Sequence, residues 1–293
     1  MLKDLVVHLD GSAADTVTLA HAEALAARFE AHLVGLYTNI FQTRFMPADL
    51  GGGTSADIIA DLLAQARQLG DESEHRLRER FANLGVASDL RRSDGSEGDL
   101  VQAIAHAARG HDLFVALRPY GVDGNRWPEL VEAALFAGGR GVYLVPPEMA
   151  KPGKLETVLI AWRDTFESTR AIAEAMPFLK RAATVVLAAV ADTEETGGEP
   201  GEGVEEMARH LKRHGLAVEH RCVRREGRIS DVILKECGAT GAGPSGHGRL
   251  RPYPAARMDP RRHHPKHPGP GPASGLDGSL NPGEAAAHQP CCK

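Results

Sequence analysis

The sequence is poor in cysteine, in aromatic residues and in long apolar runs. It holds four cysteines and no Cys-x-x-Cys pair, which excludes a disulfide scaffold and a cysteine-rich zinc module. No apolar run approaches the roughly 20 residues that span a bilayer. The apolar stretch at the N-terminus contains Asp4 and Asp10, unlike a signal peptide. We therefore expect a cytoplasmic protein with neither a membrane nor a metal partner.

The sequence also lacks an excess of positive charge. Lys and Arg number 34 against 39 Asp and Glu, which gives a net charge of −5. Sequence-independent nucleic-acid binding needs a basic face, so nucleic acid is not an expected partner. The motifs HExxH, GxxxxGK[ST] and GxSxG are absent, and no set of residues supplies an activated nucleophile beside a general base. We predict no catalytic residues and no enzyme activity.

The C-terminal segment lacks core-forming residues. Residues 238–293 contain no Val, Ile, Phe or Trp, and they hold ten of the 18 prolines. Such a segment cannot bury enough apolar surface to offset the entropy lost on ordering. We predict a disordered tail rich in Pro, Gly and His over residues 243–293.

Before that tail, two halves of the chain repeat one pattern. A short apolar run, an amphipathic helical pattern and a second apolar run occupy residues 5–9, 13–29 and 33–37. The same order recurs after a proline-rich linker, at residues 158–162, 165–179 and 184–188. Short β-branched runs that alternate with helices predict βαβ units and a parallel sheet. The fold class is therefore α/β, with tandem doubly wound sheets.

Only the first half continues the pattern to its end. A fourth strand over 111–117, a helix over 128–136 and a fifth strand over 142–145 follow there. In the second half, the Pro/Gly tail stands where the fourth and fifth strands belong. The sequence thus predicts a complete domain at 1–149 and an incomplete one at 152–242.

The chain resembles the universal stress protein family in its tandem two-domain form. The residues that carry the resemblance are Val6–Ser12, Gly85–Val86, Asp112–Val115 and Gly139–Pro146, and it covers residues 1–242. It implies a Rossmann-like fold with strand order 3-2-1-4-5 and a stress-response module. In the family, fifth strands pair across domains or subunits. Here Val142–Val145 would form that contact, in a homo-oligomer or between the two domains.

The resemblance also implies an adenine nucleotide site, for ATP or AMP, at the carboxyl ends of the first and fourth strands. Asp10 directly follows the first strand, and Gly11 allows close approach of a ligand to the backbone. The candidate site therefore comprises Asp10, Gly11, Ser12, Leu36, Arg118, Gly121 and Gly124. The alternative role for Asp10 or Ser12 is to cap the next helix.

The phosphate-binding motif of the family is Gly-x-x-Gly, nine residues, then Gly with a small residue. The first half has Gly121 and Gly124, but Ala134 and Leu135 stand nine residues on. The motif is broken, which favours an ordinary surface loop, although Arg118 could still contact a phosphate. The main alternative to nucleotide binding is therefore a ligand-free interaction or dimerisation module. Two further alternatives are a truncated product without function and a weak ATP-hydrolysing enzyme.

The tail itself has two explanations. Read one base later, the codons of Met258 and Asp259 give Trp, and suitable third bases over residues 243–262 give an apolar strand, Gly-x-x-Gly, nine residues and Gly-Gly. This is the strand and phosphate loop that the repeat predicts at that place. A frameshift is therefore our preferred hypothesis over an evolved tail.

Overall fold

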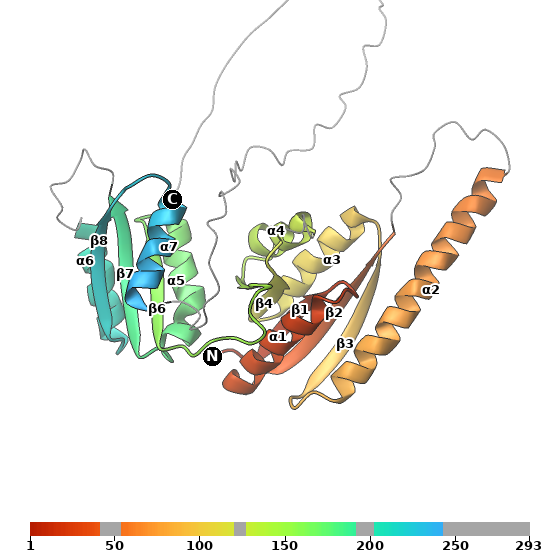
Figure 1. The fold of residues 1–293 in the computed structure, drawn as a ribbon, viewed down its shortest axis with the longest axis horizontal. Helices are drawn as coiled ribbons and strands as arrows, with labels where there is room; N and C mark the ends of the chain where they lie inside the picture. Colours follow the sequence, from red (N-terminus) through yellow and green to blue (C-terminus); the bar gives the residue numbers. More distant parts are fainter. Residues whose placement is uncertain (42–53, 120–126, 192–201, 243–293) are drawn as a thin grey trace, which may run out of the picture. The chain divides into compact units, whose positions relative to one another are not determined.

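The computed structural model describes residues 1–41, 54–119, 127–191 and 202–242, which form two parallel β-sheets with flanking helices (Figure 1). Within these residues, no helix combines the length and the apolar character needed to cross a membrane. The predicted tail, 243–293, lies outside the described residues.

Sheet A belongs to the first half and has the strand order β3-β2-β1-β4-β5, as the resemblance implies. Its strands are β1 (Asp4–Leu9), β2 (His32–Ile40), β3 (Ser88–Gly95), β4 (Leu113–Leu117) and β5 (Gly141–Val145). All neighbouring pairs are parallel, and Val6 of β1 lies between Val34 of β2 and Phe114 of β4. The chain order reverses beside β1, so the carboxyl ends of β1 and β4 form the switch point where open α/β sheets bind ligands.

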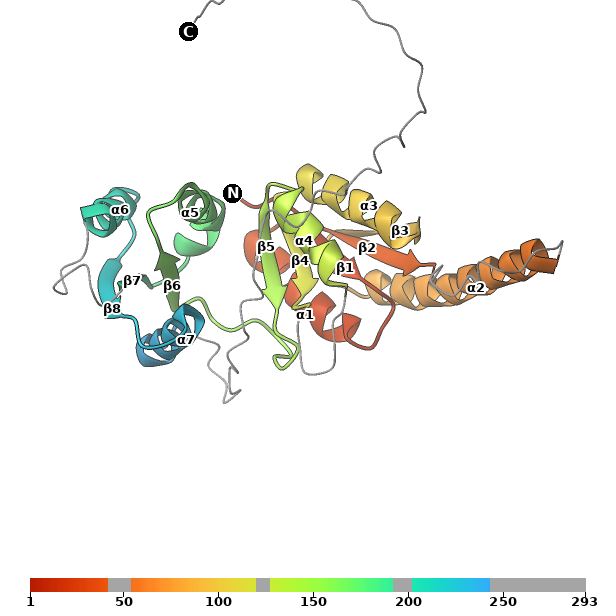
Figure 2. The ribbon, with the colours of Figure 1, turned by 90° about the horizontal axis from the view of Figure 1, so that it is seen from above.

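Four helices cover the two faces of sheet A (Figure 2). They are α1 (Asp15–Phe29), α2 (Thr54–Ala82), α3 (Glu97–Gly110) and α4 (Pro128–Phe136). Helices α1 and α2 bury Leu19, Leu25 and Leu77 in one core, and α3 and α4 bury Ile104 and Leu130 in another on the opposite face. Because both faces are covered, β1 reads as a continuous apolar run rather than an alternating one.

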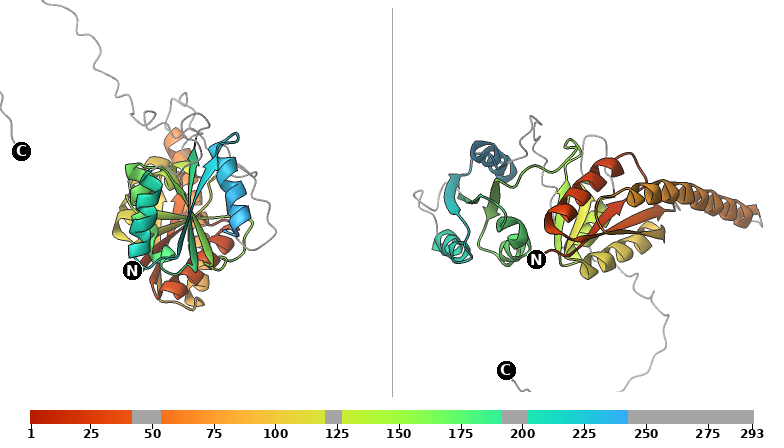
Figure 3. Two further views of the ribbon diagram at one scale, coloured as in Figure 1. Left: turned by 90° about the vertical axis from the view of Figure 1, so that its left-hand side faces the viewer. Right: turned by 90° about the horizontal axis from the view of Figure 1, so that it is seen from below.

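Sheet B belongs to the second half and has three described strands in the order β6-β7-β8. They are β6 (Thr157–Trp162), β7 (Thr184–Ala191) and β8 (Val218–Arg224), with helices α5 (Phe166–Leu179), α6 (Glu202–Arg213) and α7 (Ile229–Thr240). Helices α5 and α6 share one core on one face, and α7 (blue) covers the other (Figure 3, right). This matches the first half up to α3, and it confirms a second, smaller sheet.

Strands β6 and β1 differ in burial because they hold different positions in their sheets. Five of the six residues of β1 are buried, whereas in β6 only Trp162 is. Both strands are apolar, so the difference comes from their neighbours. Strand β1 has a partner on each side, and β6 is an edge strand of the described sheet.

Candidate functional site

A small cavity opens at the switch point of sheet A. Its wall includes His8 of β1, Asp10 after β1, Asp15 of α1, Leu117 of β4 and Trp127 before α4. Its volume is about 20 Å³, which is room for a single water molecule. A cavity thus lies where the nucleotide site was predicted, and its described walls lie close together.

The turn after β1 is held by carboxylates. The side chain of Asp15 accepts hydrogen bonds from the backbone N–H of Asp10 (3.1 Å) and of Gly11 (2.8 Å), and Asp10 Oδ1 accepts one from Ser12 N–H (3.0 Å). Gly11 has φ +80°, a left-handed conformation that favours glycine.

The start of α1 differs from the one expected with Asp10 or Ser12 as its cap. The helix begins at Asp15, and its cap residue is Ala14, which offers no side-chain acceptor. The side chain of Asp10 accepts a hydrogen bond within its own turn, and the side chain of Asp15 accepts hydrogen bonds from two backbone N–H groups of that turn. This leaves the Asp10 side chain on the wall of the cavity.

Burial shifts the pKa of two titratable groups here in ways that leave both neutral near pH 6. Desolvation raises the pKa of Asp15 to about 7, and the negative charge of Asp10 adds to the shift. Desolvation lowers the pKa of His8 to about 4, opposed by the attraction of Asp10. His8 Nε2 lies 2.8 Å from Thr38 Oγ1, which gives the neutral ring a hydrogen-bond partner.

The aromatic wall of the cavity has an unusual backbone. Trp127 has φ +48°, which is rare for a bulky side chain, and it is the cap residue of α4, with Pro128 at the first helical position. Ala134 and Leu135 lie inside α4 rather than at its start. The last turn of a helix thus stands where the second part of the glycine motif would be, and an indole side chain borders the cavity.

The remaining predicted site residues have different surroundings. Leu36 of β2 is buried in the core with Val6 and Val34 and is not part of the cavity wall. Arg118 follows β4, and its Nη2 donates a 2.6 Å hydrogen bond to Glu148. Within the described residues, the buried Nε of Arg118 has no acceptor. Gly121 and Gly124 lie outside the described residues, so their role stays a prediction.

Three residues of the site were missed by the sequence reasoning, namely His8, Asp15 and Trp127. A polar residue inside the apolar run of β1 was a usable signal for His8, and a second carboxylate five residues after Asp10 was one for Asp15. No pattern in the sequence pointed to Trp127. Over the described stretches, no three His, Cys, Asp or Glu side chains gather in a way that could hold a metal ion.

Comparison with known proteins supports the fold. No family model matches the chain, and no curated protein matches it. A solved universal stress protein from Archaeoglobus fulgidus is 13% identical, covers 81% of this chain and 84% of that chain, and has a TM-score of 0.59. A Burkholderia pseudomallei protein of the universal stress protein family is 24% identical over 50% of this chain and 96% of that one, with a TM-score of 0.32. A universal stress protein in complex with cAMP is 16% identical over 50% and 98%, with a TM-score of 0.28. The Archaeoglobus structure shows that this chain has a fold of that kind across both halves.

Proposed function

We propose that the chain is a tandem universal stress protein that acts by binding rather than by catalysis, and that its first domain works through protein contacts without a nucleotide. The observation that supports this most directly is the cavity of about 20 Å³ at the switch point. Pockets for small molecules usually measure about 300–1,000 Å³. Trp127, whose backbone is left-handed, lines this cavity with its indole side chain and narrows it.

A second candidate is an adenine nucleotide, ATP or AMP, at the same switch point. Two features favour it: Asp10 lines the cavity, and Arg118 offers a buried N–H for which the described residues contain no acceptor. A phosphate oxygen is a good acceptor for such a guanidinium N–H.

Nucleotide content separates the two candidates. The full chain is purified without added nucleotide, denatured, and its supernatant is analysed by ion-exchange chromatography, followed by titration calorimetry with ATP and with AMP. We expect no retained nucleotide, and no binding of ATP or AMP that Asp10→Ala abolishes. Stoichiometric nucleotide, lost in Asp10→Ala, would overturn the ligand-free proposal in favour of the second candidate.

A substitution of Trp127 tests whether its side chain keeps a nucleotide out of the switch-point cavity. Trp127→Gly removes the indole and suits the left-handed backbone. If the side chain closes the site, this variant gains adenine nucleotide binding that the wild type lacks. Trp162→Gly in the second half is the control for loss of an indole, and it should gain none.

The proposal includes the division of the chain. Residues 1–149 would form one domain and 152–242 a second, with a tail at 243–293 that stems from a frameshift. An association through Val142–Val145, which form the edge strand β5 of sheet A, belongs to the same proposal. DNA sequencing across the codons of residues 235–267 tests the frameshift, and stop codons in the alternative frame would refute it.

A further inference from the structure

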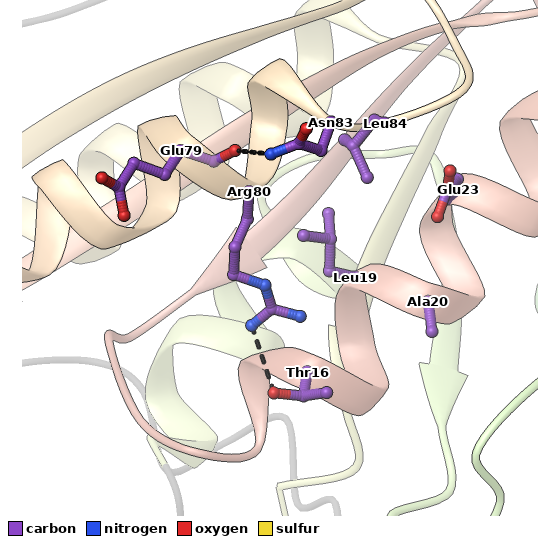
Figure 4. Close-up of a pocket in the computed structure, with 8 residues that line it drawn as sticks. All are labelled: Thr16, Leu19, Ala20, Glu23, Glu79, Arg80, Asn83 and Leu84. Carbon is purple, nitrogen blue, oxygen red and sulfur yellow. Dashed lines mark hydrogen bonds between the residues drawn. The ribbon is translucent and has the colours of Figure 1, made fainter.

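A groove runs along the first domain between α1 and α2, and one end of it reaches the turn after β1. It consists of two cavities, of about 380 and 230 Å³, that share Thr16 of α1 and Arg80 of α2 in their walls. Figure 4 shows the larger one, with the Arg80 side chain reaching from α2 towards Thr16. We call both together the α1–α2 groove. Each part alone is more than ten times larger than the switch-point cavity.

Two arginines in the groove have no acidic partner. Arg80 Nη1 donates to Thr16 Oγ1 at 3.1 Å, and Arg76 Nη2 donates to Ser73 Oγ at 2.8 Å. No carboxylate of the described residues forms an ion pair with either of them, within 4.0 Å. A guanidinium that touches only neutral hydroxyl groups keeps its full capacity for an anion.

Two neighbouring arginines, Arg78 and Arg92, are paired with carboxylates. Arg78, on the same helix, donates to Glu74 at 3.0 Å through Nε. Arg92 of β3 contacts Asp71, Glu74 and Asp94. Arg76 and Arg80 thus differ from Arg78 and Arg92, and they are the two arginines that line the α1–α2 groove.

The rest of the groove suits an anionic ligand with an apolar body. Leu19 and Leu84 line the larger cavity, and Leu77 lines the smaller one. The nearby carboxylate of Asp15 is engaged by two backbone N–H groups of the turn after β1. The carboxylate of Glu23 accepts from Gly85 N–H at 3.0 Å. A third acidic group of the walls, Glu79 of α2, has its Oε1 3.4 Å from His75 Nε2. All three acidic groups of these walls therefore have partners of their own.

We propose that the α1–α2 groove binds a small organic phosphate, with Arg76 and Arg80 as the cationic contacts of its phosphate group. Paired guanidinium groups are well suited to phosphate oxygens. The leucines would contact the organic part. The groove shares Asp15 with the switch-point cavity, but its cationic contacts come from α2 and do not line that cavity. The inference therefore goes beyond the function proposed above.

The second half provides an internal contrast. Gly85 and Gly215 follow the corresponding helices α2 and α6, and Arg80 and His210 stand five residues before them. Nine residues before them stand Arg76 and Glu206. The second half thus has a carboxylate and an imidazole where the first has two guanidinium groups. We therefore expect one phosphate site per chain.

Titration calorimetry on the full chain tests the proposal, with inorganic phosphate and phenyl phosphate as probes and ionic strength held constant with chloride. We expect saturable binding at one site per chain, tighter for phenyl phosphate because of the apolar wall. The double variant Arg76→Gln/Arg80→Gln should bind at least tenfold more weakly. Arg78→Gln is the matched control, from the same helix, and should bind like the wild type.

Three results would overturn the proposal. They are no saturable binding of either probe, unchanged affinity in the double variant, and an equal loss in Arg78→Gln, which would indicate general charge attraction. If circular dichroism shows that the double variant does not fold, the single variant Arg76→Gln is titrated in its place. Arg76 is exposed, so this substitution should leave the fold intact. Equal affinity for the two probes would contradict a ligand with an organic body.

Discussion

The first strands of the two halves, β1 and β6, both have largely apolar sequences but lie in different environments. Strand β1 lies at the centre of a five-stranded sheet, and β6 lies at the edge of a three-stranded one. Val6 and Leu159 hold equivalent positions, the third residue of each strand. Val6 is 1% exposed in the core beneath α3 and α4, and Leu159 is only partly buried.

This comparison teaches that the burial of a strand depends on elements that come much later in the chain. Strand β4 covers the second edge of β1 and brings α4 with it. The second half is described only up to α7, which corresponds to α3. The energetic value of the same apolar residue should therefore differ between the halves, and three experiments can sharpen or break that view.

The largest expected difference comes from truncating the equivalent residues. Val6→Ala should lower the free energy of unfolding of the first half by about 2–3 kcal/mol, because it leaves a void in a closed core. Leu159→Ala removes a larger side chain, yet we expect about 1 kcal/mol or less, because its surroundings are partly solvent. Urea unfolding in single-tryptophan variants, with Trp127 reporting on one half and Trp162 on the other, measures both.

Leu187→Ala is the control for the second half. Leu187 lies in the central strand β7 and is fully buried, so its truncation should cost about 3 kcal/mol. If Leu159→Ala costs as much as Leu187→Ala, the edge of β6 is covered in solution, and the comparison with β1 fails.

The second experiment is the pH dependence of the first half. The pKa of Asp15 is about 7 in the folded state against 3.8 unperturbed, so its contribution to stability falls as the pH rises from about 4 to 7. The pKa of His8 is about 4 against 6.5, so its contribution falls as the pH drops from 6.5 to 4. The two slopes oppose each other, and the wild type should change little over this window.

The variant Asp15→Asn should expose the slope of His8. Its stability should rise by roughly 2 kcal/mol between pH 4 and 6.5, measured by urea unfolding at several pH values. The equivalent positions of the second half hold Ala161 and Ser168, which do not titrate, so these two positions contribute no slope to that half. A flat profile for Asp15→Asn would show that His8 is not held neutral by burial.

The smallest expected difference concerns two glycines with the same backbone. Gly11 has φ +80° and Gly215 has φ +82°, so alanine should cost about 1 kcal/mol at either position. A Cβ at Gly11 would also lie 3.2 Å from Ser73 Oγ and from the ring of Tyr37, whereas nothing lies within 4 Å at Gly215. Gly11→Ala should therefore be the more destabilising in thermal unfolding, and equal losses would contradict the close packing of this turn.

The sequence predicted the elements better than their ends. Apolar periodicity located both sets of βαβ units, and the resemblance supplied the order 3-2-1-4-5, which is confirmed. Helix α1 was expected from Ala13 but begins at Asp15, because the preceding residues form a turn held by the Asp15 carboxylate. Strand β2 was expected to end at Tyr37 and extends to Ile40, where β3 continues to pair with it.

The site was predictable only in part. Asp10 was placed at the switch point from its position after an apolar run, and it lines the cavity there. The neutral state of Asp15 depends on burial by distant elements, and the place of Trp127 depends on how α4 meets β4, neither of which a local pattern contains. The groove between α1 and α2 was missed for the same reason, because no local pattern brings Arg76 and Arg80 of one helix beside Thr16 of another.

The open edge of β6 also sets how its amide hydrogens exchange with solvent. In a parallel strand, successive backbone N–H groups point alternately to one neighbour and to the other. Along β6, every second amide points to β7, and those between have no partner strand among the described residues. One short strand should thus hold slowly and rapidly exchanging hydrogens in alternation, whereas in β1 both neighbours protect them.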